Sequence, residues 1–146
     1  MTEIVPLTPE HLDKLLEGAP ELLAAQLGRS YFSPDSLALC LVIDGEPCFS
    51  GGLVSLQWHR AEGWVLPSPF FRQHLRVCLR EIKRELPRLA AKGGFRRIQA
   101  TCVCGLSGKL FKHLGFEFEG IMKSFGPKGE DCEMWSKVFS KETEQI

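Results

Sequence analysis

Six thiols are the first candidates for chemistry in this 146-residue sequence. The cysteines stand at positions 40, 48, 78, 102, 104 and 132. No Cys-x-x-Cys pair occurs and no Cys and His spacing fits zinc, so we predict no metal site. Most of these cysteines lie in apolar runs, where a free thiol behaves as a small buried hydrophobe. No secretory signal is recognised, and we therefore expect reduced thiols in a cytoplasmic protein.

The charge balance and the apolar runs of the chain argue against two classes of partner. Lys and Arg together number 18, as do Asp and Glu. Because nucleic-acid-binding proteins normally carry a basic excess, no nucleic acid is expected as the main partner. The basic residues between Arg72 and Arg97 are interpreted as the solvated face of a helix. No apolar run approaches the roughly 20 residues of a membrane span, so no membrane is expected either.

Hydrophobic periodicity predicts one α+β domain over residues 1–146, with a disordered tail at 140–146. A strand at 2–7 is followed by a helix with Thr8 as N-cap and Pro9 at its first position. A second helix is expected at 19–30. The dipeptide Asp44-Gly45 predicts a hairpin between 37–43 and a second strand that contains Gly51 and Gly52, which indicate a bulge or a close backbone approach.

The second half alternates helices and strands. Residues 59–63 are expected to form a turn before a short strand at 64–67. One helix is expected from Pro69 to Lys92, loosened at Pro87. Its expected buried stripe is Phe71, Leu75, Leu79, Ile82, Leu86 and Leu89. A strand at 95–103, a helix ending at Gly115 and a long hairpin over 116–139 complete the chain.

The stretch "LFKHLGFEFEG" at 110–120 resembles the C-terminal ending of acetyl-CoA-dependent N-acetyltransferases of the GNAT superfamily. The predicted order of elements is similar to that superfamily along nearly the whole chain. The resemblance implies a GNAT-like fold, in which a central, mostly antiparallel sheet of six to seven strands is flanked by about four helices. It also implies acetyl-CoA as cosubstrate and an amine, on a small molecule or a protein, as acceptor.

In GNAT enzymes the pyrophosphate of acetyl-CoA binds a glycine-rich turn at the start of the long central helix. The corresponding stretch here, "LPSPFFRQHLRV", has no glycine, and Phe70 and Phe71 are expected to fill the groove. The charge for phosphates would come from that helix, whose N-terminal dipole favours anions. The resemblance implies cofactor contacts from Arg72, Gln73, Arg76, Cys104, Ser107 and Phe111.

The acid and base positions also differ from the family's pattern. Phe111 occupies the place of a tyrosine that protonates the leaving thiolate, and a phenyl ring has no proton to donate. Cys104 could act as an acid, or as a nucleophile if its pKa were lowered. His59 and Glu62 are the candidate bases, both at a predicted turn where solvent would leave a pKa unshifted. Glu117 and Glu119 are interpreted as surface residues.

The eroded motifs leave a second reading open. The C-terminal two-thirds is similar to GNAT-like internal virion proteins of T7-like bacteriophages, and a "GPKGED" hairpin also occurs in phage-encoded GNAT-like proteins. On that reading the chain is a phage or virion protein that acts through protein contacts. Four aromatic residues would be the candidate contacts, since interfaces are enriched in such residues, with the core as the equal alternative: Trp58, Trp64, Phe70 and Trp135.

Overall fold

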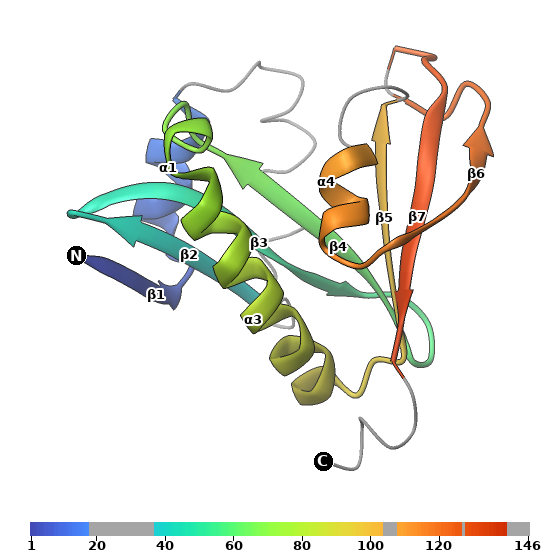
Figure 1. Cartoon of the computed structure of the whole chain (residues 1–146), viewed down its shortest axis with the longest axis horizontal. Helices are drawn as coiled ribbons and strands as arrows, with labels where there is room; N and C mark the ends of the chain where they lie inside the picture. Colours follow the sequence, from blue (N-terminus) through green and yellow to red (C-terminus); the bar gives the residue numbers. More distant parts are fainter. Residues whose placement is uncertain (18–36, 104–107, 127, 140–146) are drawn as a thin grey trace.

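The computed structural model describes residues 1–17, 37–103, 108–126 and 128–139. These residues form one seven-stranded sheet in the order β1-β2-β3-β4-β5-β7-β6 (Figure 1). The strands are β1 (Thr2–Pro6), β2 (Leu37–Ile43), β3 (Glu46–Ser55), β4 (Arg60–Pro67), β5 (Arg97–Val103), β6 (Glu117–Met122) and β7 (Cys132–Val138). All neighbours are antiparallel except β4 and β5. The predicted α+β class and mostly antiparallel sheet are confirmed.

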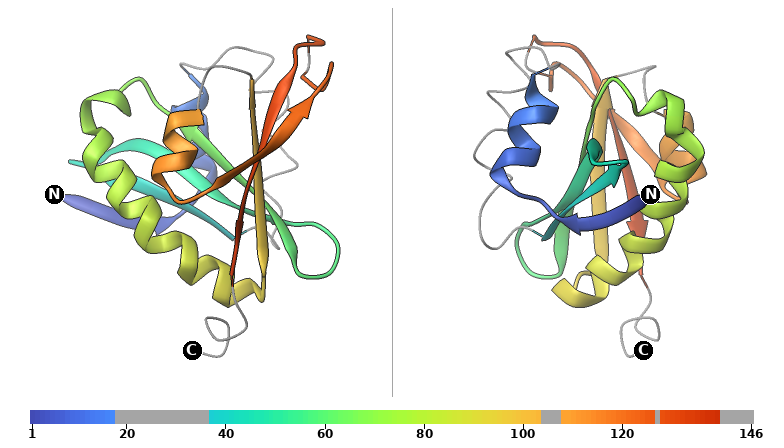
Figure 2. Two further views of the ribbon diagram at one scale, coloured as in Figure 1. Left: turned by 45° about the vertical axis from the view of Figure 1, so that its right-hand side comes forward. Right: turned by 90° about the vertical axis from the view of Figure 1, so that its left-hand side faces the viewer.

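The described residues contain three α-helices, whereas about four were expected for the whole chain. The described residues contain α1 (Pro9–Leu16), α3 (Leu75–Gly93), α4 (Gly108–His113) and a short 3-10 turn, η1 (Arg72–His74). The helix predicted at 19–30 and the tail at 140–146 lie outside the described residues. Viewed along the sheet, α1 covers one face while α3 and α4 cover the other (Figure 2).

The start of α1 follows the local sequence. Thr8 Oγ1 accepts a hydrogen bond from the backbone N–H of His11 at 3.2 Å, and His11 Nδ1 accepts one from the N–H of Thr8. This reciprocal cap satisfies two N–H groups that the first helical turn leaves unpaired. Leu15 then anchors the helix against Cys40, Trp64 and Leu66 of the sheet.

The long helix begins later than predicted. Residues 68–71 form a turn in which the Ser68 hydroxyl accepts from the N–H of Phe70, and η1 precedes α3. The most buried positions of α3 are Cys78, Glu81, Leu86 and Ala90, whereas Leu75 is 40% exposed. The expected stripe is therefore partly wrong, because the 3-10 turn changes the rotation with which α3 meets the sheet.

The basic residues of α3 lie on its solvent face, as interpreted from the sequence: Arg76, Arg80, Lys83, Arg84, Arg88 and Lys92 are all exposed. Three of them pair with acidic residues of the same helix. Arg80 and Arg84 contact Glu81, and Arg88 Nη1 lies 3.2 Å from Glu85 Oε1. The buried Glu81 is thus compensated by Arg80, which precedes it, and by Arg84 one turn later.

The β2–β3 hairpin forms at Asp44-Gly45 as predicted, with φ of 50° and 81°. At Gly52 the two strands approach closely, because a Cβ there would lie 2.4 Å from the carbonyl oxygen of Leu37. The register shift between these strands lies elsewhere, between Leu41 and Val42. Of the two expectations for the glycines, the close approach is correct.

The start of β4 affects the place of the candidate base Glu62. The predicted turn at 59–63 is wrong, since β4 already starts at Arg60 and the turn is centred on Trp58, whose φ is 60°. The carbonyl of His59 accepts from the N–H of Arg96 at 2.8 Å, which holds this turn against the start of β5. Glu62 is consequently a strand residue.

A polar cluster ties the three C-terminal strands together. Arg97 of β5 donates two hydrogen bonds of 2.7 Å to the carboxylate of Glu119 on β6, and the Ser136 hydroxyl of β7 donates to the same group. A bulge between Phe118 and Gly120 places Glu119 for these contacts. The Arg97 guanidinium and the Ser136 hydroxyl lower the pKa of Glu119 to about 2. Glu117 and Glu119 are exposed, as predicted.

Replacing Arg97 by methionine is expected to remove a pH-dependent part of the stability. Because the pKa of Glu119 is lower in the folded chain than its ordinary 4.5, this contribution is present above pH 4.5 and disappears as the pH falls toward 2. Exposed pairs are worth about 0–1 kcal/mol. Urea unfolding at pH 7 and pH 3 should show a larger loss at pH 7. Arg88→Met is the control for an exposed arginine, and an equal loss at both pH values would contradict the assignment.

Candidate functional site

The sheet opens into a fork between β4 and β5. These two parallel strands pair over only three positions, from Arg60 with Arg97 to Glu62 with Gln99. Beyond them β4 continues along β3 to Pro67 and β5 continues along β7 to Val103, and the two strands diverge (Figure 1). Past Glu62 the facing edges of β4 and β5 therefore carry backbone groups that are not paired across the fork.

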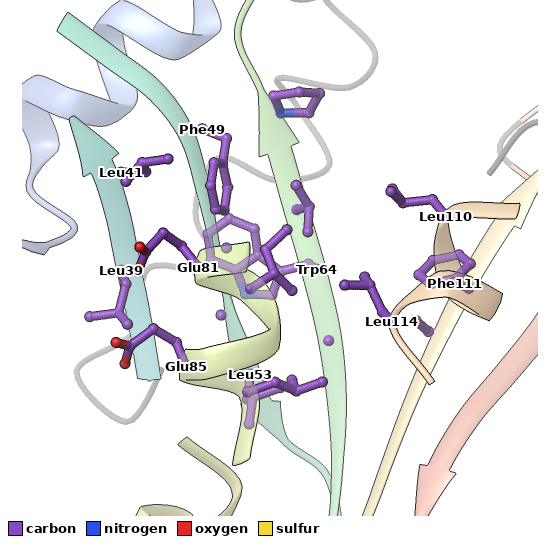
Figure 3. A pocket seen from close by; sticks show the side chains of 18 of the residues that line it. Leu39, Leu41, Phe49, Leu53, Trp64, Glu81, Glu85, Leu110, Phe111 and Leu114 are labelled. Atoms are coloured by element: carbon purple, nitrogen blue, oxygen red, sulfur yellow. The ribbon is translucent and has the colours of Figure 1, made fainter. Parts of the chain in front are cut away.

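A groove follows this fork on the face covered by α3 and α4. Its volume is about 410 Å³, within the range of small-molecule sites. Figure 3 shows Leu110 of α4 and Leu114, the residue after α4, on one side of it, opposite the side chains of α3 and β2. Its wall is mainly apolar and includes Leu53, Val65, Leu86, Ala100, Phe111 and Phe116. We call this cavity the fork groove.

The two phenylalanines expected to fill the groove do not fill it. Phe71 lines the groove wall and packs edge-on against Phe49, with ring centroids 5.7 Å apart. Phe70 does not line the groove and is 47% exposed. The side chain of Phe71 is drawn into the core beside Cys48 and Cys78, so the groove stays open.

The turn before α3 has largely used its own hydrogen-bond donors. The N–H of Ser68 donates to Cys48, that of Phe71 to Ser68 and that of His74 to Phe71, at 3.0–3.2 Å. The N–H of Phe70 donates to the Ser68 hydroxyl at 3.1 Å. A phosphate cradle needs such N–H groups to be available, so this turn is a weaker anion site than a glycine loop.

The predicted cofactor residues divide into three groups. Arg72 and Phe111 line the fork groove. Gln73 and Arg76 are exposed near the start of α3 but do not line it. Cys104 and Ser107 lie outside the described residues. The Phe111 ring lies 5.6 Å from Phe116 and 6.0 Å from Trp135, centroid to centroid, in an aromatic wall.

The two candidate bases differ in their burial. His59 is exposed in the turn before β4, as the sequence suggested. Glu62 is half-buried on β4, and burial raises the pKa of its carboxyl, which corrects the expectation of an unshifted group. Trp64 and Leu66 face α1, so strand alternation places Glu62 on that face, opposite the fork groove. It occupies the last paired position before the strands diverge.

The four aromatic residues considered as candidate protein contacts differ in their exposure. Trp58 is 82% exposed with the guanidinium of Arg60 over its ring, and Phe70 is exposed as well. Trp64 and Trp135 are buried in core clusters, which is the alternative to an interface role for these two residues.

Three groups at the groove were missed by the sequence analysis. Glu81 and Glu85 line its α3 side, and Cys102 lines its α4 side beside Glu133 of β7. The pattern "EIKRE" placed both glutamates on a charged helix, where burial is unexpected. The contact of Cys102 with Glu133 depends on the β5–β7 register, for which the sequence contains no local signal.

Neither a metal centre nor a membrane span emerges from the parts of the chain that the structure describes. Those residues bring together no group of three His, Cys, Asp or Glu side chains that could hold a metal ion. Their longest helix is α3, and its charged face keeps it from meeting the requirements of a membrane span.

Comparisons with known proteins identify the class of fold. No protein-family model and no curated protein sequence matches the chain. Solved structures match nearly all of it: the Escherichia coli ribosomal-protein-S18-alanine N-acetyltransferase aligns with a TM-score of 0.70 and 17% identity over 96% of this chain and 95% of that one. A GNAT-family acetyltransferase from Streptococcus pneumoniae gives 0.65 and 17% over 96% and 100%. Ard1 from Thermoplasma volcanium gives 0.73 and 10% over 96% and 99%.

The chain therefore has the GNAT acetyltransferase fold, as the ending "LFKHLGFEFEG" predicted. At these identities the likeness extends to the fold alone. The resemblance to phage virion proteins stays a prediction.

Proposed function

We propose that this protein is an N-acyltransferase that moves an acetyl group from acetyl-CoA to an amine. The observation that carries the proposal is the apolar fork groove, which runs along strand edges that are unpaired across the fork. A thin acyl-pantetheine arm has apolar stretches and amide groups, which match such a wall and such edges. The acceptor is an amine on a small molecule or a protein.

The fit to acetyl-CoA is uneven along the molecule. The groove suits the acyl-pantetheine arm in size and polarity. At the diphosphate end the turn at 68–74 has used most of its N–H groups, and the exposed cations Arg72 and Arg76 are left to provide charge. Such exposed contacts are screened by salt. We therefore expect acetyl-CoA to bind more weakly as the ionic strength rises.

The chain's own groups suggest a direct transfer. Backbone N–H groups on the unpaired edge of β4 would hold the thioester carbonyl oxygen, where negative charge develops. Glu62, on the opposite face at the base of the fork, would take the proton from the attacking amine. Its raised pKa makes it a stronger base than an exposed carboxylate. The apolar groove walls would exclude water.

Acetyl-CoA is expected to raise the midpoint of thermal unfolding. A ligand at a hundred times its Kd adds about 2.7 kcal/mol to the folded state. For a domain of this size that corresponds to a rise of about 8 °C. Val65→Trp is the matched control and should show no such rise. Val65 lines the groove and is 38% exposed, so a larger side chain can be accommodated there and would obstruct the groove. A missing rise in the unchanged protein would contradict acetyl-CoA binding.

A non-catalytic role through protein contacts is the second candidate. It is favoured by Trp58, which is 82% exposed at the tip of the β3–β4 hairpin in a left-handed backbone conformation. Non-glycine residues rarely adopt that conformation without a reason in the surrounding structure. The same thermal experiment separates the two candidates. A protein that acts only through protein contacts would show no rise of the midpoint with acetyl-CoA, either in the unchanged protein or in Val65→Trp.

A further inference from the structure

A thiol and a carboxylate meet in the α4 wall of the fork groove. Cys102 on β5 lies opposite Glu133 on β7, and its Sγ donates to Glu133 Oε1 at 3.6 Å. Trp135 Nε1 donates to the same oxygen at 2.9 Å. A Cβ on Gly108 would lie 3.1 Å from that oxygen, so the start of α4 passes close to the carboxylate. The fold thus holds one carboxylate oxygen between an indole and a thiol.

The position of Cys102 in the groove makes its thiol a candidate proton donor. The ionisable side chains on the α3 side of the lining are Arg72, Glu81 and Glu85, and Figure 3 shows the two glutamates directed toward β2, away from α4. Both glutamates contact arginines of α3. On the α4 side Cys102 lines the groove together with Phe111, a ring without a transferable proton. Of the described lining residues on that side, Cys102 carries the acidic proton.

We propose that Cys102 donates the proton that the leaving sulfur takes up during acyl transfer, and that Glu133 is its positioning residue. This inference rests on the proposed function. The amine nitrogen forms a bond to the carbonyl carbon, the carbon–sulfur bond breaks, and its electron pair leaves with the sulfur. The sulfur takes the proton of the Cys102 thiol. The Cys102 thiolate then recovers a proton from the acylated nitrogen by way of Glu62 or water, so the enzyme ends unchanged.

The neighbouring carboxylate explains why Cys102 is a donor and not a nucleophile. An anion beside a thiol opposes formation of the thiolate, and apolar surroundings strengthen the repulsion. The same repulsion acts on a bare thiolate leaving group, which makes protonation of that group useful. Because the same repulsion acts on both sulfurs, the proton moves between them without a large uphill step.

The contact between Cys102 and Glu133 can be tested without measuring acyl transfer. The rate at which iodoacetamide alkylates Cys102 is measured between pH 7 and 9 in the unchanged protein and in Glu133→Gln. Fragment-ion mass spectrometry separates Cys102 from Cys104, which lies in the same tryptic peptide. Removing the carboxylate should speed alkylation about tenfold at pH 8, while Cys132, which does not line the groove, serves as an internal reference. An unchanged or slower rate would overturn the pairing.

The steady-state rate of acyl transfer tests the role of Cys102 as the proton donor. Cys102→Ser keeps the shape but replaces the thiol by a much weaker acid, and it should lower kcat by about 100-fold with the KM for acetyl-CoA unchanged. Cys132→Ala is the matched control and should keep the unchanged rate. A Cys102→Ser variant with full kcat, or an acetyl group found on Cys102, overturns this inference alone. Absence of acetyl-CoA binding overturns the proposed function, and binding without turnover overturns both.

Discussion

Glu62→Gln is expected to lower kcat/KM for the amine by about 100-fold or more, because general bases typically contribute 10²–10⁴-fold. In the unchanged protein the rate should fall as the pH drops through the raised pKa of Glu62, and the variant should lack this acidic limb. Rates over pH 5–9 with acetyl-CoA held constant provide the measurement. Glu117→Gln is the matched control, an exposed glutamate on β6 across the same face of the sheet.

Stability separates a catalytic from a structural role of Glu62. Burial raises its pKa, so the folded chain holds the proton more tightly than the unfolded chain does. Folding stability is then lost as the pH rises from the ordinary value of 4.5 through the raised one. Because glutamine carries no charge, the variant should be at least as stable as the unchanged protein at pH 7. Activity within twofold of the unchanged protein would exclude Glu62 as the base.

Gly52→Ala is expected to destabilise the fold by about 3 kcal/mol, at the upper end of overpacking costs. The added methyl group would lie 2.4 Å from the Leu37 carbonyl oxygen and 2.8 Å from the Ala38 Cα, both backbone atoms that cannot rotate away. The thermal midpoint should fall by about 10 °C.

Gly45→Ala provides the comparison for this prediction. Gly45 has φ of 81° with nothing within 4 Å of its added Cβ, so it tests backbone strain without a clash. Left-handed strain of that kind costs about 1–2 kcal/mol. If Gly52→Ala lowers the midpoint less than Gly45→Ala does, the close approach of β2 and β3 is wrong. Because Gly52 also lines the fork groove, its replacement is expected to weaken acetyl-CoA binding as well.

Most of the fold could be predicted because its signals are local. The Thr8 cap, the Asp44-Gly45 turn and the left-handed Gly115 are properties of a few adjacent residues, and the structure has all three. The predicted order of elements, together with "LFKHLGFEFEG", was sufficient to predict the GNAT fold. The start of α3 was misplaced because a 3-10 turn has no distinct periodicity over three residues.

The candidate site could be predicted only in part, because its properties depend on neighbours far along the chain. The sequence by itself determined that Phe111 has no proton to donate and that no glycine loop precedes α3. Only the tertiary structure decided that Phe71 turns into the core and leaves the groove open, that Glu62 is half-buried at the base of the fork, and that Cys102 meets Glu133. These three outcomes depend on strand register and on burial between layers of the fold, and neither is determined by residue type or local spacing.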